Sequence, residues 1–164
     1  MLNRDEFGGN QPSVFTKKYS GIISEIITNI EISPSEDSDQ PSQKQISKLS
    51  TLALWDTGAT HSAITSSTVK TLGLVPKSMA LVHHAGGKGY QWIHYIDIHF
   101  PNQVTKKLVR VTECQTIRGN FNVIIGMDII SAGDFALTNK DKKAVFSFMM
   151  PSIHIIDFKE EMED

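Results

Sequence analysis

The most constraining feature of the sequence is a succession of short β-branched and aromatic segments separated by Gly, Pro, Asn and Ser. The segments that fit strands are 46–55, 79–84, 90–100, 104–113, 121–125, 135–138 and 144–149. Only 66–72 and 127–132 fit short helices, the first bounded by Thr65 as a cap and Gly73 as a stop. Many short strands with little helix predict an all-β barrel or sandwich with one or two short helices.

Length and composition indicate one domain with loosely held ends. A chain of 164 residues of which 40% are hydrophobic is long enough for one packed core. Segment 21–32 is rich in Ile and Thr and stops at Ser33-Pro34, which favours a strand. The expected organisation is a flexible N-terminal segment 1–12, a folded domain 13–156, a long polar loop 33–45 within it, and an acidic tail 157–164.

Charge and cysteine content exclude several classes of protein. A formal net charge of −2 gives no electrostatic basis for binding nucleic acid or an anionic membrane. Cys114 is the single cysteine, which excludes an internal disulfide and a multi-cysteine zinc site. No apolar run approaches the roughly 18 residues that a membrane helix needs, and residues 1–10 lack the apolar middle of a signal peptide. We expect a cytoplasmic protein that needs neither a metal nor an organic cofactor.

The segment with the clearest chemistry is an apolar strand, 52–55, that is followed at once by Asp56, Thr57 and Gly58. A carboxylate at the end of a hydrophobic strand is partly removed from water. Gly58 lets the backbone turn sharply beneath it, and the Thr57 hydroxyl can donate to a neighbouring carbonyl. An Asp-Thr-Gly triplet arises by chance in about 3% of chains of this length, so the triplet needs supporting motifs.

Two such motifs follow in order. A glycine-rich hairpin tip, 86–89, begins about thirty residues after Asp56, and the apolar strand 123–125 runs into Gly126 and a short helix. Together with the triplet, they resemble the retropepsin-like aspartic proteases over roughly residues 18–152. The segments 133–139 and 144–148 look most like the bacterial branch of that family.

This resemblance implies a closed β-barrel that works as a homodimeric aspartic endopeptidase. Asp56 would be the catalytic carboxylate, and Thr57 and Gly58 would support its loop. The residues that would contact substrate, from the loop and from a flap, are Ala59, Thr60, Ala85, Gly86 and Gly87. The residues that would pack beneath the catalytic loop are Ile124, Ile125 and Gly126.

The homodimer follows from the chemistry of the family. In aspartic proteases two carboxyls share one proton and hold one water molecule. The sequence contains only one Asp-Thr/Ser-Gly triplet, so Asp56 of each of two chains would have to meet at a two-fold axis. An extended polypeptide would then pair as an added strand between flap and floor.

Two positions depart from the retroviral members and keep alternatives open. Thr60 and Met127 stand where many of those members have an acidic residue and an arginine that pair. Losing both together avoids leaving one charge unpaired near an interface. The alternative function is a non-catalytic dimeric module that binds extended peptides, and a third is a purely structural β-domain.

Other chemistry-bearing residues have simpler interpretations. His94 and His99 would point to opposite faces of a regular strand and so cannot share a metal ion. Cys114 is expected to be a small buried hydrophobe, not a nucleophile. Asp128 is expected to cap a helix or face solvent, and Asp134 to belong to a turn. The aromatic residues that either line a substrate groove or pack in a core or dimer interface are Trp55, Tyr90 and Trp92.

Overall fold

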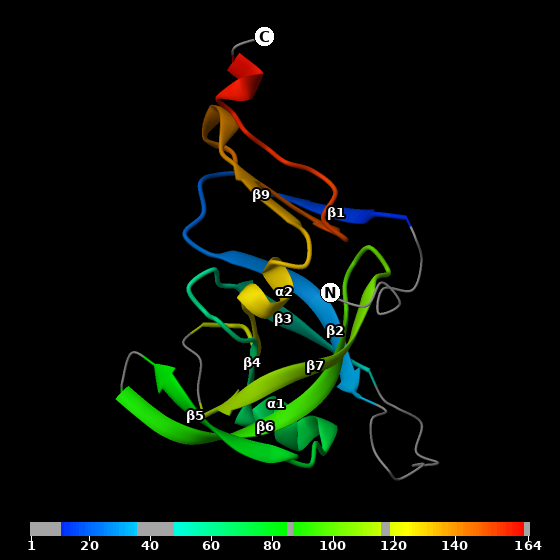
Figure 1. The fold of residues 1–164 in the computed structure, drawn as a ribbon, viewed down its shortest axis with the longest axis vertical. Helices are drawn as coiled ribbons and strands as arrows, with labels where there is room; N and C mark the ends of the chain where they lie inside the picture. Colours follow the sequence, from blue (N-terminus) through cyan, green and yellow to red (C-terminus); the bar gives the residue numbers. More distant parts are fainter. Residues whose placement is uncertain (1–10, 36–47, 85–86, 116–118, 163–164) are drawn as a thin grey trace.

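The protein is mostly β and forms a three-stranded and a seven-stranded sheet. The computed structural model describes residues 11–35, 48–84, 87–115 and 119–162. The small sheet has the order β1-β10-β9 and is antiparallel throughout; its strands are β1 (Ser13–Lys18), β9 (Asp134–Thr138) and β10 (Val145–Met150). It therefore places the first described strand beside the last two strands of the chain (Figure 1).

The large sheet closes on itself. Its order is β2-β3-β8-β4-β7-β6-β5, and β2 pairs with β6 as well, so six strands form a ring with β5 attached outside it. The strands are β2 (Ile26–Pro34), β3 (Leu49–Trp55), β4 (Ala63–Thr65), β5 (Ser78–His84), β6 (Gly87–His99), β7 (Thr105–Cys114) and β8 (Val123–Ile125). Closure satisfies backbone groups that an open sheet would expose at its edges.

Two short α-helices follow strands of the ring. α1 (Ser66–Leu72) has the predicted bounds, with the Thr65 side chain accepting from the Thr68 N–H and Gly73 left-handed at φ 63°. α2 (Met127–Ile130) is shorter than predicted, and two 3₁₀ turns lie at 140–142 and 160–162. In the described ranges, the helices are all too short or too polar to cross a membrane.

One aromatic core joins the two sheets. Trp55, at the end of β3, packs against Phe146 and Phe148 of β10 at centroid distances of 5.1 and 4.7 Å. Its indole N–H donates to the Thr28 hydroxyl over 2.9 Å, which satisfies a buried donor. The small sheet thus packs against the end of β3, the strand that Asp56 follows.

The strands predicted from the sequence are confirmed within a few residues, with exceptions. Segment 21–25 is not strand. β2 runs on through Ser33-Pro34, where a stop was predicted, because residues 31–34 pair with β6. Two strands were missed: β1, for which no strand was predicted, and the three-residue β4, which is too short to show periodicity. Gly87, predicted at the hairpin tip, begins β6 and pairs with His84. Residues 1–10, most of the predicted loop 33–45, and Ala85 and Gly86 lie outside the described residues.

The Asp134 carboxylate binds the segment that follows β10 through several hydrogen bonds. Predicted to lie in a turn, Asp134 is instead the first residue of β9, and its carboxylate accepts from the Ser152 hydroxyl, from the N–H groups of Ile153 and His154 at 3.1 and 3.0 Å, and from His154 Nδ1. Burial raises the pKa of a carboxyl, but these hydrogen bonds outweigh it and lower the pKa of Asp134 from 3.8 to about 2.

Asp134→Asn is expected to destabilise the protein at neutral pH by about 1 kcal/mol, because an amide cannot accept all of these bonds. A lowered carboxyl pKa gives stability that is present above the ordinary pKa and lost as pH falls through the folded-state value of about 2. The difference between the two proteins should therefore shrink between about pH 4 and about pH 2 in thermal unfolding. A difference that stays constant to pH 2 would contradict this account. Asp141→Asn, at an exposed carboxylate, is the control.

Candidate active site

The Asp56 carboxylate is held in a tight turn at the end of β3. Its own N–H donates to the Ile125 carbonyl over 2.9 Å, which extends the parallel pairing of β3 and β8 by one step. The Gly58 N–H donates to Asp56 Oδ1 over 2.8 Å, and the Ala59 N–H donates to the Asp56 carbonyl over 3.2 Å. Within the described ranges no group donates to Oδ2, so one oxygen is oriented by the loop while the other is open to a ligand or water.

Thr57 and Gly58 are exposed beside this carboxylate. The Thr57 hydroxyl has no hydrogen-bond partner among the residues that the structure describes, so it is available to a second molecule. A Cβ atom at Gly58 would stand 3.2 Å from Asp56 Oδ1, tighter than an ordinary van der Waals contact. Glycine at position 58 therefore leaves enough room for the Asp56 carboxylate to fold back over the turn.

Gly126 lies directly beneath the loop. It follows β8, in which Ile125 is buried and Ile124 is half-buried. A Cβ atom at Gly126 would lie 2.7 Å from the His61 carbonyl carbon and 2.9 Å from the Ala59 carbonyl oxygen. These contacts are to backbone, which cannot move aside without shifting the loop, so the close approach requires glycine here.

Thr60 and Met127 lie where the loop meets the first turn of α2. The Met127 N–H donates to the Ala59 carbonyl over 2.8 Å, and the Asp128 N–H donates to the Thr60 carbonyl over 3.3 Å. Both Thr60 and Met127 are exposed. Backbone hydrogen bonds therefore tie the loop to α2, with no charged side chain at Thr60 or Met127.

Ser62 and Asp128 form a further connection that the sequence analysis missed. Ser62 is fully buried; its N–H and hydroxyl donate to the two Asp128 carboxylate oxygens at 3.0 and 2.8 Å, and its hydroxyl accepts from the Gly126 N–H at 3.1 Å. Asp128 was expected to cap a helix or face solvent, but it is half-buried and binds Ser62 across the loop. No local pattern signals a pair this far apart in the chain.

Asp128→Ala is expected to lower the free energy of unfolding by about 1–3 kcal/mol, because two donors of the buried Ser62 lose their acceptor. Chemical denaturation of the variant and of Glu160→Ala, a control at an exposed carboxylate, measures the difference. Equal midpoints for the wild type and Asp128→Ala would show that the Ser62–Asp128 connection contributes nothing.

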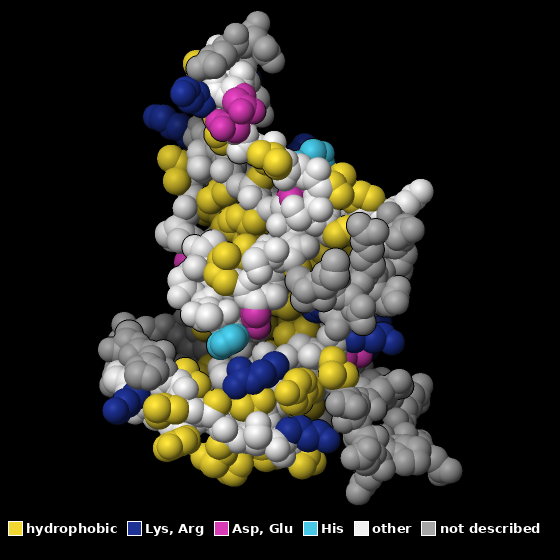
Figure 2. All heavy atoms as spheres, in the orientation of Figure 1, with side chains coloured by type: hydrophobic (Ala, Val, Ile, Leu, Met, Phe, Trp, Pro, Cys, Tyr) yellow, Lys and Arg dark blue, Asp and Glu magenta, His cyan; other side chains and the backbone are white. Residues whose placement is uncertain are grey.

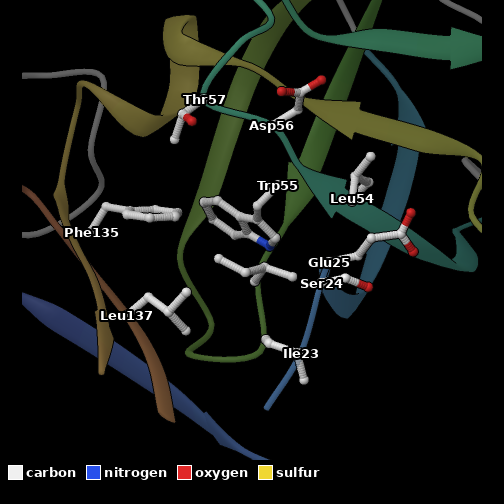
Figure 3. Close-up of a pocket in the computed structure, with 10 residues that line it drawn as sticks. Ile23, Ser24, Glu25, Leu54, Trp55, Asp56, Thr57, Phe135 and Leu137 are labelled. Atoms are coloured by element: carbon white, nitrogen blue, oxygen red, sulfur yellow. The ribbon is translucent and has the colours of Figure 1, made fainter. Parts of the chain in front are cut away.

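A pocket of about 420 Å³ opens beside Asp56. Its lining comes from the turn before β2, from the end of β3 and from β9: Ile23, Ser24, Glu25, Ile26, Leu54, Trp55, Asp56, Thr57, Phe135 and Leu137. Figure 3 shows Phe135 and Leu137 on one side, Leu54 and Glu25 on the other, and Asp56 at one end. Pocket and carboxylate thus form one site.

The histidines and the cysteine lie elsewhere in the ring. His94 is buried and binds Glu113 at 2.9 Å, whereas His99 binds Ser33 and Thr105. Burial raises the pKa of the Cys114 thiol, which donates to the Ile64 carbonyl. Cys114 is half-buried, less than predicted. Among the described residues no group of three or more metal-binding side chains comes together.

The three aromatic residues singled out from the sequence have different surroundings. Trp55 is in the core and also lines the pocket. Tyr90 and Trp92 of β6 are exposed, and they pair across the hairpin with the exposed Leu81 and Met79 of β5. Figure 2 shows hydrophobic side chains along the lower edge of the molecule, where Figure 1 places this hairpin.

Comparison with known proteins identifies the fold. Neither a family model nor a curated protein matches the sequence. A retropepsin-like aspartic protease from Rickettsia conorii matches the structure over 85% of this chain and 96% of that one, with a TM-score of 0.50 and 11% sequence identity. The chain has a retropepsin-like fold. At this identity the likeness shows the fold alone.

The retropepsin-like fold brings the predicted motifs together. Asp56, Thr57 and Gly58 follow β3, and Ile124, Ile125 and Gly126 lie in or after the adjacent strand β8. Ala59 is half-buried and Thr60 is exposed at the far side of the turn. Gly87 begins β6 and pairs with His84 in the last register position of the β5–β6 hairpin, and Ala85 and Gly86 are outside the described ranges.

Proposed function

We propose that the chain is an aspartic endopeptidase that hydrolyses peptide bonds as a homodimer. The observation that carries this proposal is the Asp56 carboxylate, fixed through Oδ1 by the Gly58 N–H and open at Oδ2, at the mouth of a pocket. The retropepsin-like fold supports it, since a solved structure similar to this chain is that of an aspartic protease.

The reaction needs the Asp56 carboxyl of each of two chains. One ionised carboxyl removes a proton from water as the water oxygen attacks the scissile carbonyl carbon, and the protonated carboxyl donates to the carbonyl oxygen. Collapse of the resulting diol breaks the C–N bond, and the amine leaves with a proton from the pair. Because protons pass only between carboxyls, water and substrate, this chemistry requires no metal or organic cofactor.

The remaining predicted residues have roles in this proposal. The exposed Thr57 hydroxyl binds the partner's loop across the two-fold axis. Ala59 and Thr60, with a flap that includes Ala85, Gly86 and Gly87, hold an extended polypeptide by backbone hydrogen bonds. Ile124, Ile125 and Gly126 form the floor, and the ring of strands is the closed barrel of a domain spanning 13–156.

Incubation with an unfolded polypeptide from about pH 3 to about pH 8 tests the activity, since a shared-proton pair works only where it carries one proton. The expected result is cleavage that a statine-type inhibitor blocks, with one inhibitor bound per two chains. A dimer that binds the inhibitor without cleaving would instead support the non-catalytic peptide-binding module. A protein that neither binds nor cleaves would leave only a structural β-domain.

Dilution tests the composite site. If each active centre needs two chains, activity below the dimer dissociation constant should fall with the square of the chain concentration. Activity assays run in parallel with sedimentation measure both quantities on the same sample. Activity per chain that stays constant down to a demonstrated monomer would rule out a shared pair of Asp56 residues.

A further inference from the structure

We propose that the pocket beside Asp56 selects a lysine or arginine side chain next to the scissile bond, with Glu25 as the partner of its charge. This inference rests on the proposed peptidase function and names its substrate class. The pocket and Asp56 are continuous, so a side chain that fills the pocket belongs to a residue adjoining the bond that Asp56 attacks.

The walls of the pocket suit a long aliphatic stem. Ile23, Leu54, Phe135 and Leu137 supply apolar surface from three separate parts of the fold (Figure 3). Its volume of about 420 Å³ accommodates an extended side chain. Lysine and arginine bury their methylene stems along apolar surface and keep the charged end at a polar rim.

The charged groups of the pocket are carboxylates. Ile26 pairs with Trp55 in the last register position of β2 and β3, so Glu25, just before it, and Asp56, just after it, lie at the same end of the strand pair. Among the described residues that line the pocket there is no Lys, Arg or His. A cationic end is therefore attracted here, and an acidic side chain is repelled.

Glu25 is free to bind such a group. It is exposed at the pocket, and within the described ranges it has neither a hydrogen bond nor an ion pair. By contrast, Glu31 on β2 already lies 3.7 Å from Lys48. A substrate cation would therefore pair with Glu25 without breaking any contact that Glu25 makes to the described part of the chain.

The test compares matched peptides that carry lysine, norleucine or glutamate beside the scissile bond. Norleucine keeps the aliphatic stem and removes the charge. The full-length wild type is expected to cleave the lysine peptide about five- to tenfold more efficiently than the norleucine peptide, and the glutamate peptide least. In Glu25→Gln the lysine-to-norleucine ratio of kcat/KM should fall to about 1, and in Glu25→Lys the order of lysine and glutamate should reverse. Glu31→Gln is the control and should keep the wild-type ratio.

A second readout separates this inference from the proposed function. The same three side chains are placed in peptides with a non-cleavable statine unit, and binding is measured. Cleavage of generic polypeptide with a lysine-to-norleucine ratio near 1 overturns the selection by Glu25 and leaves the peptidase standing. Preferred binding of the lysine peptide without any cleavage supports the pocket's selectivity and overturns the peptidase. A ratio unchanged in Glu25→Gln also overturns the role of Glu25.

Discussion

Asp56→Asn should reduce kcat/KM by on the order of 10³-fold or more while the fold is retained. The amide has almost the same shape as the carboxyl, and its oxygen can still accept from the Gly58 N–H, which is 2.8 Å from Asp56 Oδ1. It cannot, however, take a proton from water. Peptide hydrolysis and thermal unfolding of the purified variant measure the two effects separately.

Mixing the wild type with Asp56→Asn turns this substitution into a test of the dimer. In an equal mixture that exchanges subunits, about a quarter of the dimers carry two Asp56 residues, so the activity of a fixed amount of wild type should fall by about half. An inert carrier protein at the same concentration is the control. Full activity in the mixture would mean that one Asp56 per dimer suffices. If Asp56→Asn alone cleaved peptide at the wild-type rate, Asp56 would not be the catalytic carboxyl.

Gly126→Ala should impair both the stability and the activity although it adds one methyl group. The new Cβ would lie 2.7 Å from the His61 carbonyl carbon and 2.9 Å from the Ala59 and His61 carbonyl oxygens. Relief of this overlap must push the Asp56 loop away from β8, at a cost of about 1–3 kcal/mol. A displacement of about 1 Å at the carboxylate would lower kcat by about 100-fold.

Gly21→Ala is the matched control for this substitution. No atom lies within 4 Å of a Cβ built at Gly21, and its backbone is not in the left-handed region. The free energy of unfolding from denaturant titration and kcat from peptide cleavage should both stay near the wild-type values in the control. If Gly126→Ala behaves like Gly21→Ala, the floor of the site is looser than the contacts at Gly126 indicate.

Together these substitutions separate chemistry from support. Asp56→Asn removes a proton acceptor and leaves the backbone in place, whereas Gly126→Ala keeps the carboxyl and displaces the loop that carries it. Asp128→Ala also weakens the support of this loop, through the buried Ser62. A loss of stability shared by the last two, but absent in the first, is expected if the loop is held mainly by β8 and α2.

The sequence by itself determined the features that depend on near neighbours in the chain. The alternation of apolar residues predicted most strands, and Thr65 and Gly73 predicted both ends of α1, because caps and pleats act over a few residues. The Asp56 turn was likewise readable, since Gly58 binds the carboxylate from two residues away.

Only the tertiary structure decided which distant segments support that turn. The Ser62–Asp128 pair, the Gly126 floor and the meeting of Glu25 with Phe135 at one pocket join residues from separate strands. The first two follow from the pairing of β8 with β4 and with β3, and the pocket follows from the pairing of β2 with β3 and the packing of the small sheet on Trp55. A carboxylate has the same local pattern whether it faces solvent or a buried serine, so its partner is set by the fold that surrounds it.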